Sequence, residues 1–252
     1  EAELFLRKAA GVEPANFNAH YLLGAALSRL GKVEEAVRAW RNALQIQPDN
    51  AKLLSILAVE YSKGRYFQDA ARAAKQAISL APSEERLYYL AIKSFQDAGD
   101  TDSAFSLAAE AVKRFPHSAR AHFEYGFHLQ KTGRVEPALD HLAKAMELDP
   151  RYEEPPFFYA DLLVKQQRHE EAIPYARKAI EIRPDYVPAR VLLGRALMSL
   201  KRWDEAVREL DEAIRHSPDH PQPWLLLSQI YFRLGDETKA REARDRSLQL
   251  RR

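Results

Sequence analysis

Histidines are the side chains in this sequence with the clearest potential for metal chemistry. There are eight of them, and there is no cysteine. The closest spacings are His117 with His122 and His216 with His220, and each pair falls at an expected helix boundary rather than on one helical face. A zinc site needs three or four converging ligands. We therefore predict histidines in solvated loops and no metal site.

Paired carboxylates are a second candidate for chemistry, as a general acid and a general base. Glu34 with Glu35 and Asp204 with Glu205 are examples, and similar acidic residues recur just before a regularly spaced alanine. Negative charge in the first turn of a helix complements the helix dipole, which explains this recurrence without catalysis. We predict that the chain is not an enzyme and that it has no catalytic residue.

The elements that carry these side chains follow a repeat of 34 residues. The interval is kept without insertion or deletion by the prolines Pro14, Pro48, Pro82, Pro116, Pro150, Pro184 and Pro218. Alanines stand twelve and five residues before each proline. Small residues recur at the same interval, with Ile92 as the exception: Gly24, Ala58, Gly126, Ala160, Gly194 and Ser228. Such a regular spacing indicates an internal repeat.

Each period contains two stretches with apolar residues at three- and four-residue spacing, which predicts two helices. In the first period they lie near 17–30 and 34–47. The first helix is expected to end in a left-handed residue. The glycines at or beside this turn are Gly31, Gly64, Gly99, Gly133 and Gly235, and Gln167 and Lys201 replace glycine in the fifth and sixth repeats. The repeats thus use eight of the nine glycines. No glycine-rich loop is left for a nucleotide, and we predict no cofactor.

These markers resemble those of the tetratricopeptide repeat, a 34-residue helical hairpin. The first copy runs His20, Leu23, Gly24, Leu27, Ala36, Trp40, Ala43, Pro48, and the last begins Trp224, Leu227, Ser228, Tyr231, Ala240. The resemblance implies an all-α, right-handed superhelical solenoid that forms a single array over residues 1–252. Its parts are the second helix of a truncated repeat at 1–16 and seven repeats at 17–50, 51–84, 85–118, 119–152, 153–186, 187–220 and 221–252.

The two ends of the chain differ from the regular repeats. The sequence opens inside what should be a hairpin, so we expect it to be cut from a longer protein. At the other end, Arg241, Arg244 and Ser247 place polar groups where most repeats have apolar or small residues. This is expected of a terminal helix that faces solvent. The alternative is that a further helix packs there.

The overall charge limits the classes of partner. The formal charge is +2 over 252 residues, whereas nucleic-acid-binding domains carry a strongly basic face. The sequence has no run of about 18 apolar residues, so membrane insertion is not expected. A soluble protein is predicted, with a cytoplasmic location slightly favoured. The partner is therefore expected to be a protein or a peptide.

In the family that the chain resembles, the first helices of successive repeats line a concave groove. The residues predicted to face this groove and bind a peptide are Tyr21, Lys52, Arg86, Tyr89, Lys93, Arg120, Phe123, Phe127, Phe157, Asp161 and Arg195. Aromatic residues concentrate in the middle of the array, and the cations suit an acidic ligand. The alternative is that the rings pack as ordinary core.

The resemblance favours a non-catalytic protein–protein interaction scaffold that holds a peptide or protein segment in its groove. Two other functions stay open. The segment could be the regulatory or substrate-presenting arm of a larger enzyme, or it could form a homo-oligomer through an exposed face or an open end of the solenoid.

Overall fold

The computed structural model describes residues 2–251, and all regular structure in that range is α-helical. The chain divides into two compact units, and the boundary lies between Pro116 and His117. The first contains α1 (Ala2–Val12), α2 (Phe17–Arg29), α3 (Val33–Ile46), α4 (Ala51–Lys63), α5 (Phe67–Leu80), α6 (Glu85–Asp97) and α7 (Thr101–Arg114). The second contains α8 (Ala119–Lys131), α9 (Val135–Leu148), α10 (Glu154–Lys165), α11 (His169–Ile182), α12 (Val187–Ser199), α13 (Trp203–His216), α14 (Pro221–Arg233) and α15 (Glu237–Gln249).

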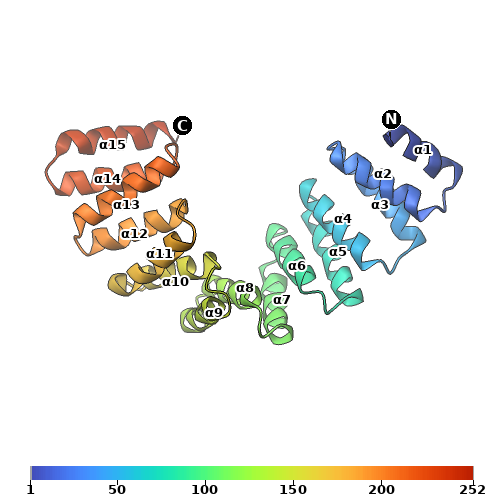
Figure 1. Cartoon of the computed structure of the whole chain (residues 1–252), viewed down its shortest axis with the longest axis horizontal. Helices are drawn as coiled ribbons and strands as arrows, with labels where there is room; N and C mark the ends of the chain where they lie inside the picture. The colour runs from blue at the N-terminus through green and yellow to red at the C-terminus, as the bar shows by residue number, and fades with distance from the viewer. Residues whose placement is uncertain (1, 252) are drawn as a thin grey trace. The chain divides into compact units, whose positions relative to one another are not determined.

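Within each unit, a first helix pairs with the second helix of its own repeat, and the next repeat packs against that pair (Figure 1). The predicted all-α solenoid of helix-turn-helix repeats is confirmed, and the helix bounds agree with the expected ones to within a residue or two. The single array over residues 1–252 stays a prediction.

Several first helices begin at a side chain that caps them. Asn16 Oδ1, Asn50 Oδ1 and Ser118 Oγ accept hydrogen bonds from the backbone N–H three residues further on, at 3.0, 2.9 and 3.1 Å. These bonds satisfy N–H groups that have no partner inside the helix. Tyr152 and Tyr186 occupy the same repeat position, but α10 and α12 have no side-chain cap. Both tyrosines instead contact aromatic rings of the second unit.

The turn inside each hairpin contains one residue with a positive φ angle, and in one repeat the glycine lies beside that residue. Gly31, Gly99, Gly133 and Gly235 have φ between 73° and 81°. In the second repeat the left-handed residue is Arg65, with φ of 62°, whereas Gly64 beside it has φ of −77°. The turn keeps the 34-residue register, which places the left-handed residue at 65. Gly64 instead makes room for Tyr66, whose ring lies 2.6 Å from where a Cβ would be.

Replacing Lys201 by glycine is expected to raise the free energy of unfolding by about 1 kcal/mol, because the left-handed region is unfavourable for residues with a Cβ. Lys201 is exposed and has φ of 59°, so little packing is lost. Urea unfolding followed by circular dichroism measures the change. The reverse exchange, Gly133→Lys, should lower stability by a similar amount. A loss of stability in Lys201→Gly would contradict the strain argument.

The small residues of the first helices lie against a residue sixteen positions later in the second helix. A Cβ added to Gly24 would lie 2.5 Å from the Trp40 indole nitrogen. At Gly194 the added atom would lie 2.9 Å from Leu210. Gly126 faces Leu142 in the same way, at 3.1 Å. In these hairpins glycine allows a large side chain to pack against the first helix.

Three other repeats have alanine at the second position, a pairing that was not predicted from the sequence. Where the first position is Ala58, Ile92 or Ala160, the residue sixteen positions later is alanine, and all of these residues are buried. Among these three pairs, Ile92 with Ala108 has the large residue on the first helix and the small one on the second, the reverse of Gly24 with Trp40. This explains Ile92, the exception in the series of small residues, because its partner position is Ala108.

The polar residues of the last helix do not all face solvent, so this prediction is wrong for Ser247. Arg241 and Arg244 are exposed as predicted. Ser247 is 1% exposed, and its hydroxyl donates a hydrogen bond to the Pro221 carbonyl at 2.9 Å. In earlier repeats an alanine occupies this position between the two helices. The small serine fits there because its hydroxyl finds a backbone acceptor.

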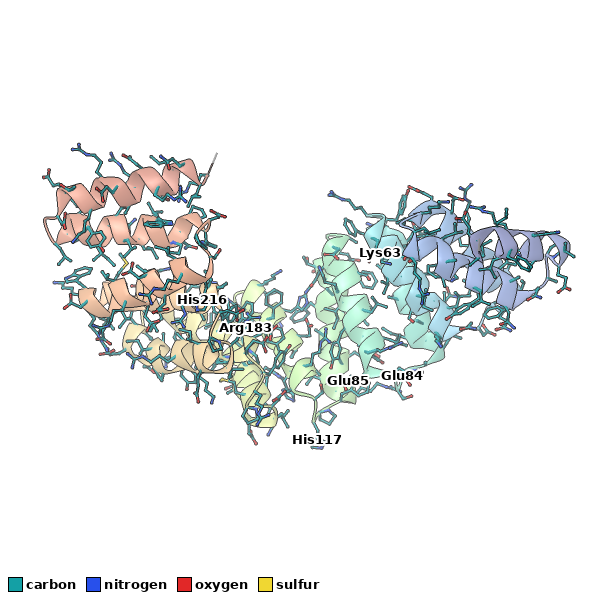
Figure 2. The ribbon with its side chains drawn as sticks, turned by 45° about the horizontal axis from the view of Figure 1, so that its top comes forward. Lys63, Glu84, Glu85, His117, Arg183 and His216 are labelled. Carbon is teal, nitrogen blue, oxygen red and sulfur yellow. The ribbon has the colours of Figure 1, made fainter. Side chains whose placement is uncertain are left out.

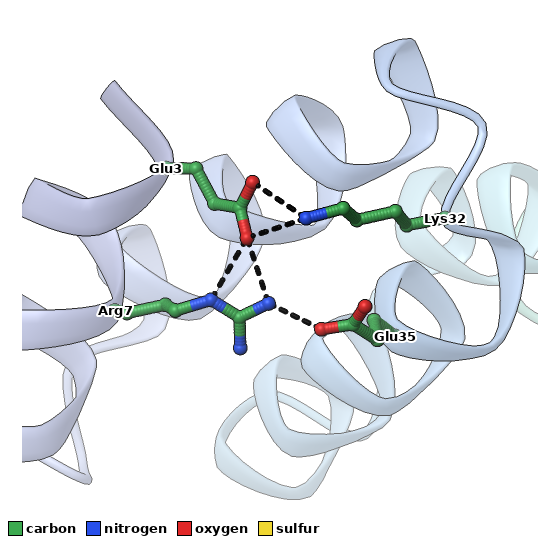
Figure 3. A network of polar contacts seen from close by, with 4 residues as sticks. All are labelled: Glu3, Arg7, Lys32 and Glu35. Atoms are coloured by element: carbon green, nitrogen blue, oxygen red, sulfur yellow. Dashed lines mark hydrogen bonds and ion pairs between the residues drawn. The ribbon is translucent and has the colours of Figure 1, made fainter. Parts of the chain in front are cut away.

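Exposed ion pairs join successive second helices. In the first unit, Glu3 on α1 accepts hydrogen bonds from Lys32 at 3.0 Å and from Arg7, and Arg7 also donates to Glu35 on α3 (Figure 3). In the second unit, Arg177 and Glu205 occupy the repeat positions of Arg7 and Glu35 and lie 3.0 Å apart. Exposed pairs of this kind add little stability, so we assign the cohesion of each unit to its buried apolar contacts.

Candidate protein-binding face

The predicted aromatic cluster forms in the second unit. The Phe123 ring lies 6.2 Å from Phe127, 5.2 Å from Tyr152 and 5.4 Å from Phe158, measured between ring centroids. Phe127 in turn contacts Phe158 at 5.2 Å, nearly edge to face. Edge-to-face and offset pairs at these distances are favourable. Helices α8 and α10 are therefore joined by rings that hold one another in place.

Phe157 extends the same cluster towards α12. Its ring lies 5.1 Å from both Phe158 and Tyr186. The Arg183 guanidinium stacks over Tyr186 at 3.5 Å and donates a hydrogen bond to Glu153 at 3.2 Å, and Figure 2 labels Arg183 among the side chains of this unit. Burial raises the pKa of Tyr186 to about 12. Tyr186 therefore stays a neutral phenol at physiological pH.

The sequence left open whether these rings bind a ligand or pack as core, and their burial differs from ring to ring. Phe123 is 9% exposed, so it is part of the core. Phe127 and Phe157 are only half-buried, although each contacts other rings. An aromatic side chain that is fixed on one side and exposed on the other loses little entropy when a ligand covers it. Phe127 and Phe157 are therefore the rings of this cluster that suit binding.

Charged residues at the inward positions of the second unit differ in their contacts. Asp161 pairs with Lys165 at 2.6 Å and accepts a hydrogen bond from Gln130 at 3.0 Å, so it is already engaged within the protein. Arg120 lies 3.8 Å from Glu124. Arg195 on α12 is exposed and makes no ion pair with the described residues. Among these three predicted residues, Arg195 is the one best placed to bind an external carboxylate.

The predicted aromatic residues of the first unit are partly used in packing. Tyr89 is 6% exposed and donates its hydroxyl hydrogen to Glu85, which Figure 2 labels. Tyr21 is half-buried and stacks on Phe17 at 5.7 Å. Tyr89 is therefore a core residue in this unit, whereas Tyr21 keeps part of its ring exposed.

The predicted cations of the first unit fall into two groups. Lys93 pairs with Asp97 at 2.6 Å. Lys52 and Arg86 are exposed, and within residues 2–251 neither makes an ion pair. Lys52 and Arg86 are therefore the cations of this unit that remain available to an external ligand.

A buried carboxylate lies close to the inward positions of the first unit. Glu60 is 1% exposed and accepts hydrogen bonds from Ser28 and from Lys63, both at 2.8 Å. Lys63, labelled in Figure 2, also donates to the Ser28 hydroxyl at 3.1 Å. Because the serine hydrogen points to a carboxylate that a lysine neutralises, we interpret this trio as a structural contact between α2 and α4.

The histidine contacts differ from those suggested by spacing along the chain. His117 and His216 are exposed, as predicted, and both are labelled in Figure 2. His122 instead meets His141 across the hairpin, with the two Nδ1 atoms 3.0 Å apart. Burial, and secondarily the neighbouring His122, lower the pKa of His141. No group of three histidine, aspartate or glutamate side chains within residues 2–251 could hold a metal ion.

Three rings of the aromatic cluster were not predicted from the sequence: Tyr152, Phe158 and Tyr186. The two tyrosines lie 34 residues apart, at the position where asparagine or serine caps other first helices. Aromatic residues at a capping position were therefore a detectable signal. Phe158 directly follows Phe157 on α10, and nothing in its spacing distinguishes it from a core residue.

Comparisons with known proteins agree with this architecture. Family models described as tetratricopeptide repeat match residues 17–50, residues 95–154 with 163–215, and residues 191–251. No curated protein matches the sequence. No helix in the described part of the chain combines the length and apolarity that crossing a bilayer requires.

Solved structures share the fold at low sequence identity. A chain of the APC/C hetero-tetramer Cut9–Hcn1 is 16% identical, with a TM-score of 0.70 over 98% of this chain and 49% of its own length. PilW, described as a type IV pilus biogenesis factor, is 22% identical, with a TM-score of 0.68 over 77% of this chain and 90% of its own. YrrB, described as a TPR protein with an unusual peptide-binding site, is 20% identical, with a TM-score of 0.58 over 73% of this chain and 95% of its own.

Proposed function

Because the chain belongs to the tetratricopeptide repeat family, we propose that it is a non-catalytic scaffold that binds a peptide or protein segment through the inward positions of its first helices. The observation that carries this proposal is the aromatic cluster of the second unit, which leaves Phe127 and Phe157 half-buried. Rigid, partly exposed rings are typical anchors in protein interfaces. The peptide-binding site attributed to YrrB supports this role for a similar fold.

The charges at the inward positions favour a segment with acidic residues. Lys52 and Arg86 in the first unit and Arg195 in the second are exposed and make no ion pair with residues 2–251. A carboxylate of the bound segment would gain a charge-assisted hydrogen bond without displacing an internal partner. Lys93, in contrast, would first have to leave Asp97. We therefore assign charge recognition to Lys52 and Arg86 within the first unit and, separately, to Arg195 within the second.

The double variant Phe127→Ala with Phe157→Ala is expected to weaken peptide binding by about tenfold, or about 1.4 kcal/mol. The probe is the tightest peptide selected from a random display library on the intact chain, and calorimetry gives its dissociation constant. Phe123 is left intact because it is buried, and truncating it would disturb the fold. Phe5→Ala with Leu30→Ala, at residues that are 81% and 59% exposed, is the control. Equal affinities for the wild type and the Phe127/Phe157 variant, with both folded, would contradict the proposal.

A further inference from the structure

The C-terminal end of the second unit has a groove that lies outside the aromatic cluster and the three cations to which the proposed function assigns binding. It has a volume of about 880 Å³ and is bordered by α12, α13, α14 and α15. Apolar side chains line it, among them Met198, Trp203, Leu225 and Phe232. Phe232 is 69% exposed, whereas Met198, Trp203 and Leu225 are partly buried. A protruding phenylalanine beside an apolar floor is typical of a contact surface.

The rim of the groove is positively charged. Arg233, Arg241 and Arg244 line it against one carboxylate, Glu237, which leaves a net charge of +2. Within residues 2–251, Arg233 and Arg241 make no ion pair, and Arg244 reaches only Asp245, at 3.9 Å. All three guanidinium groups are exposed. They are therefore free to bind carboxylates from outside the unit.

The groove includes the face of a second helix that other repeats cover with the next first helix. Helix α11 packs against α12 in this way, and α13 packs against α14. The residues at the repeat position of Arg241 include Leu139 and Ile173, whereas Arg244 occupies the position of Leu142 and Leu210, which pack against the first helix of their own hairpin. All four of these side chains are buried. The outer face of α15 thus has an exposed Arg241 where Leu139 and Ile173 are buried in other repeats, and Arg244 is exposed beside it.

A helix that served only to end the array would have a polar outer face. The two arginines meet this expectation, but Phe232 and the apolar floor do not. We propose that this groove docks an acidic amphipathic helix of a partner protein. The apolar face of that helix covers Phe232 and Leu225, and its carboxylates pair with Arg241 and Arg244. Helix-in-groove recognition uses the same division between apolar anchors and flanking charges. The inference does not rest on the aromatic cluster around Phe123.

The test uses the full chain and two fluorescent helical peptides with the same leucine face. One carries glutamates on its polar face, and the other carries lysines. In anisotropy titrations we expect the glutamate peptide to bind about tenfold more tightly, and to weaken as salt increases. Arg241→Glu with Arg244→Glu should invert this preference. Phe232→Ser should weaken the glutamate peptide by about tenfold, as expected for an anchor.

The matched control is Arg208→Glu with Arg246→Glu, which changes the net charge equally at exposed residues that do not line the groove. It should retain the wild-type preference. If the glutamate peptide does not bind, or binds the Arg241/Arg244 variant as tightly as the wild type, the proposal is wrong. Self-association in sedimentation experiments that Phe232→Ser abolishes would assign the groove to a second copy of the chain, and it would equally overturn the acidic partner.

Discussion

Gly24→Ile in the first hairpin is expected to lower the free energy of unfolding by about 3 kcal/mol, the upper range for overpacking a core. A Cβ at this position would overlap the Trp40 indole, which is only 4% exposed. The indole cannot move aside easily, because its nitrogen donates a hydrogen bond to the Tyr21 carbonyl at 3.0 Å. The extra side chain must therefore separate α2 from α3.

The third repeat indicates how this loss can be reversed. Ile92 is 1% exposed, and the residue sixteen positions later is alanine. Trp40→Ala alone is expected to cost about 3–5 kcal/mol through the cavity that it leaves. Gly24→Ile with Trp40→Ala reproduces the pairing of the third repeat. We expect the double variant to lose at least about 2 kcal/mol less than the sum of the single variants.

Urea unfolding of the four proteins gives this coupling energy, and hydrogen exchange of α2 and α3 shows whether the loss is confined to their hairpin. The control is Gly11→Ile, because a Cβ at Gly11 meets no atom within 4 Å. It should change stability by less than about 0.5 kcal/mol, as is usual for surface substitutions. Additive losses in the cycle would show that the two positions do not share one volume.

The packing of Gly24 against Trp40 illustrates which features of the hairpins can be predicted from the sequence and which cannot. The 34-residue interval predicts every hairpin, because a helix and its partner lie within one period. The small residues were recognised as a series, but their large or small partners lie on another helix, and only the packing reveals which residue each one meets. Arg65 was missed for a similar reason. The adjacent Gly64 is the better left-handed residue by type, but the register of the turn selects position 65.

The residues of the candidate site were predicted from their types and repeat positions. Their burial in the structure then shows which of them are accessible to a ligand. Phe123, Phe127 and Phe157 do converge, as the repeat positions implied. The burial of Phe123 depends on Tyr152 and Phe158, which approach it from elsewhere in the unit. The contacts of Asp161 were not predicted either. It pairs with Lys165, four residues along its own helix, and accepts a hydrogen bond from Gln130 on a neighbouring helix. Spacing identifies a repeat position, whereas availability for a ligand depends on the neighbours of each side chain.

Acidification from pH 7.5 to pH 5 is expected to lower the free energy of unfolding by about 2 kcal/mol through His128 alone. The side chain of His128 is 3% exposed, and burial together with the nearby Lys131 lowers its pKa from 6.5 to about 4. The unfolded chain takes up a proton near pH 6.5, whereas the folded protein resists protonation. The stability from the neutral ring is complete above pH 6.5 and falls as the pH drops towards 4. His141 adds to the slope in the same direction, since its pKa is also lowered.

His128→Leu should remove this part of the pH dependence, because leucine and isoleucine occupy the same buried repeat position at Leu162 and Ile230. Urea unfolding at pH 7.5, 6 and 5 measures the slope for the wild type and the variant. His117→Leu, at an exposed residue, controls for the loss of a histidine and should keep the wild-type slope. If His128→Leu also keeps that slope, His128 must accept a proton in the folded protein. The ring would then have to reach water or an acceptor within α8 and its neighbours, and its burial would not be the source of acid sensitivity.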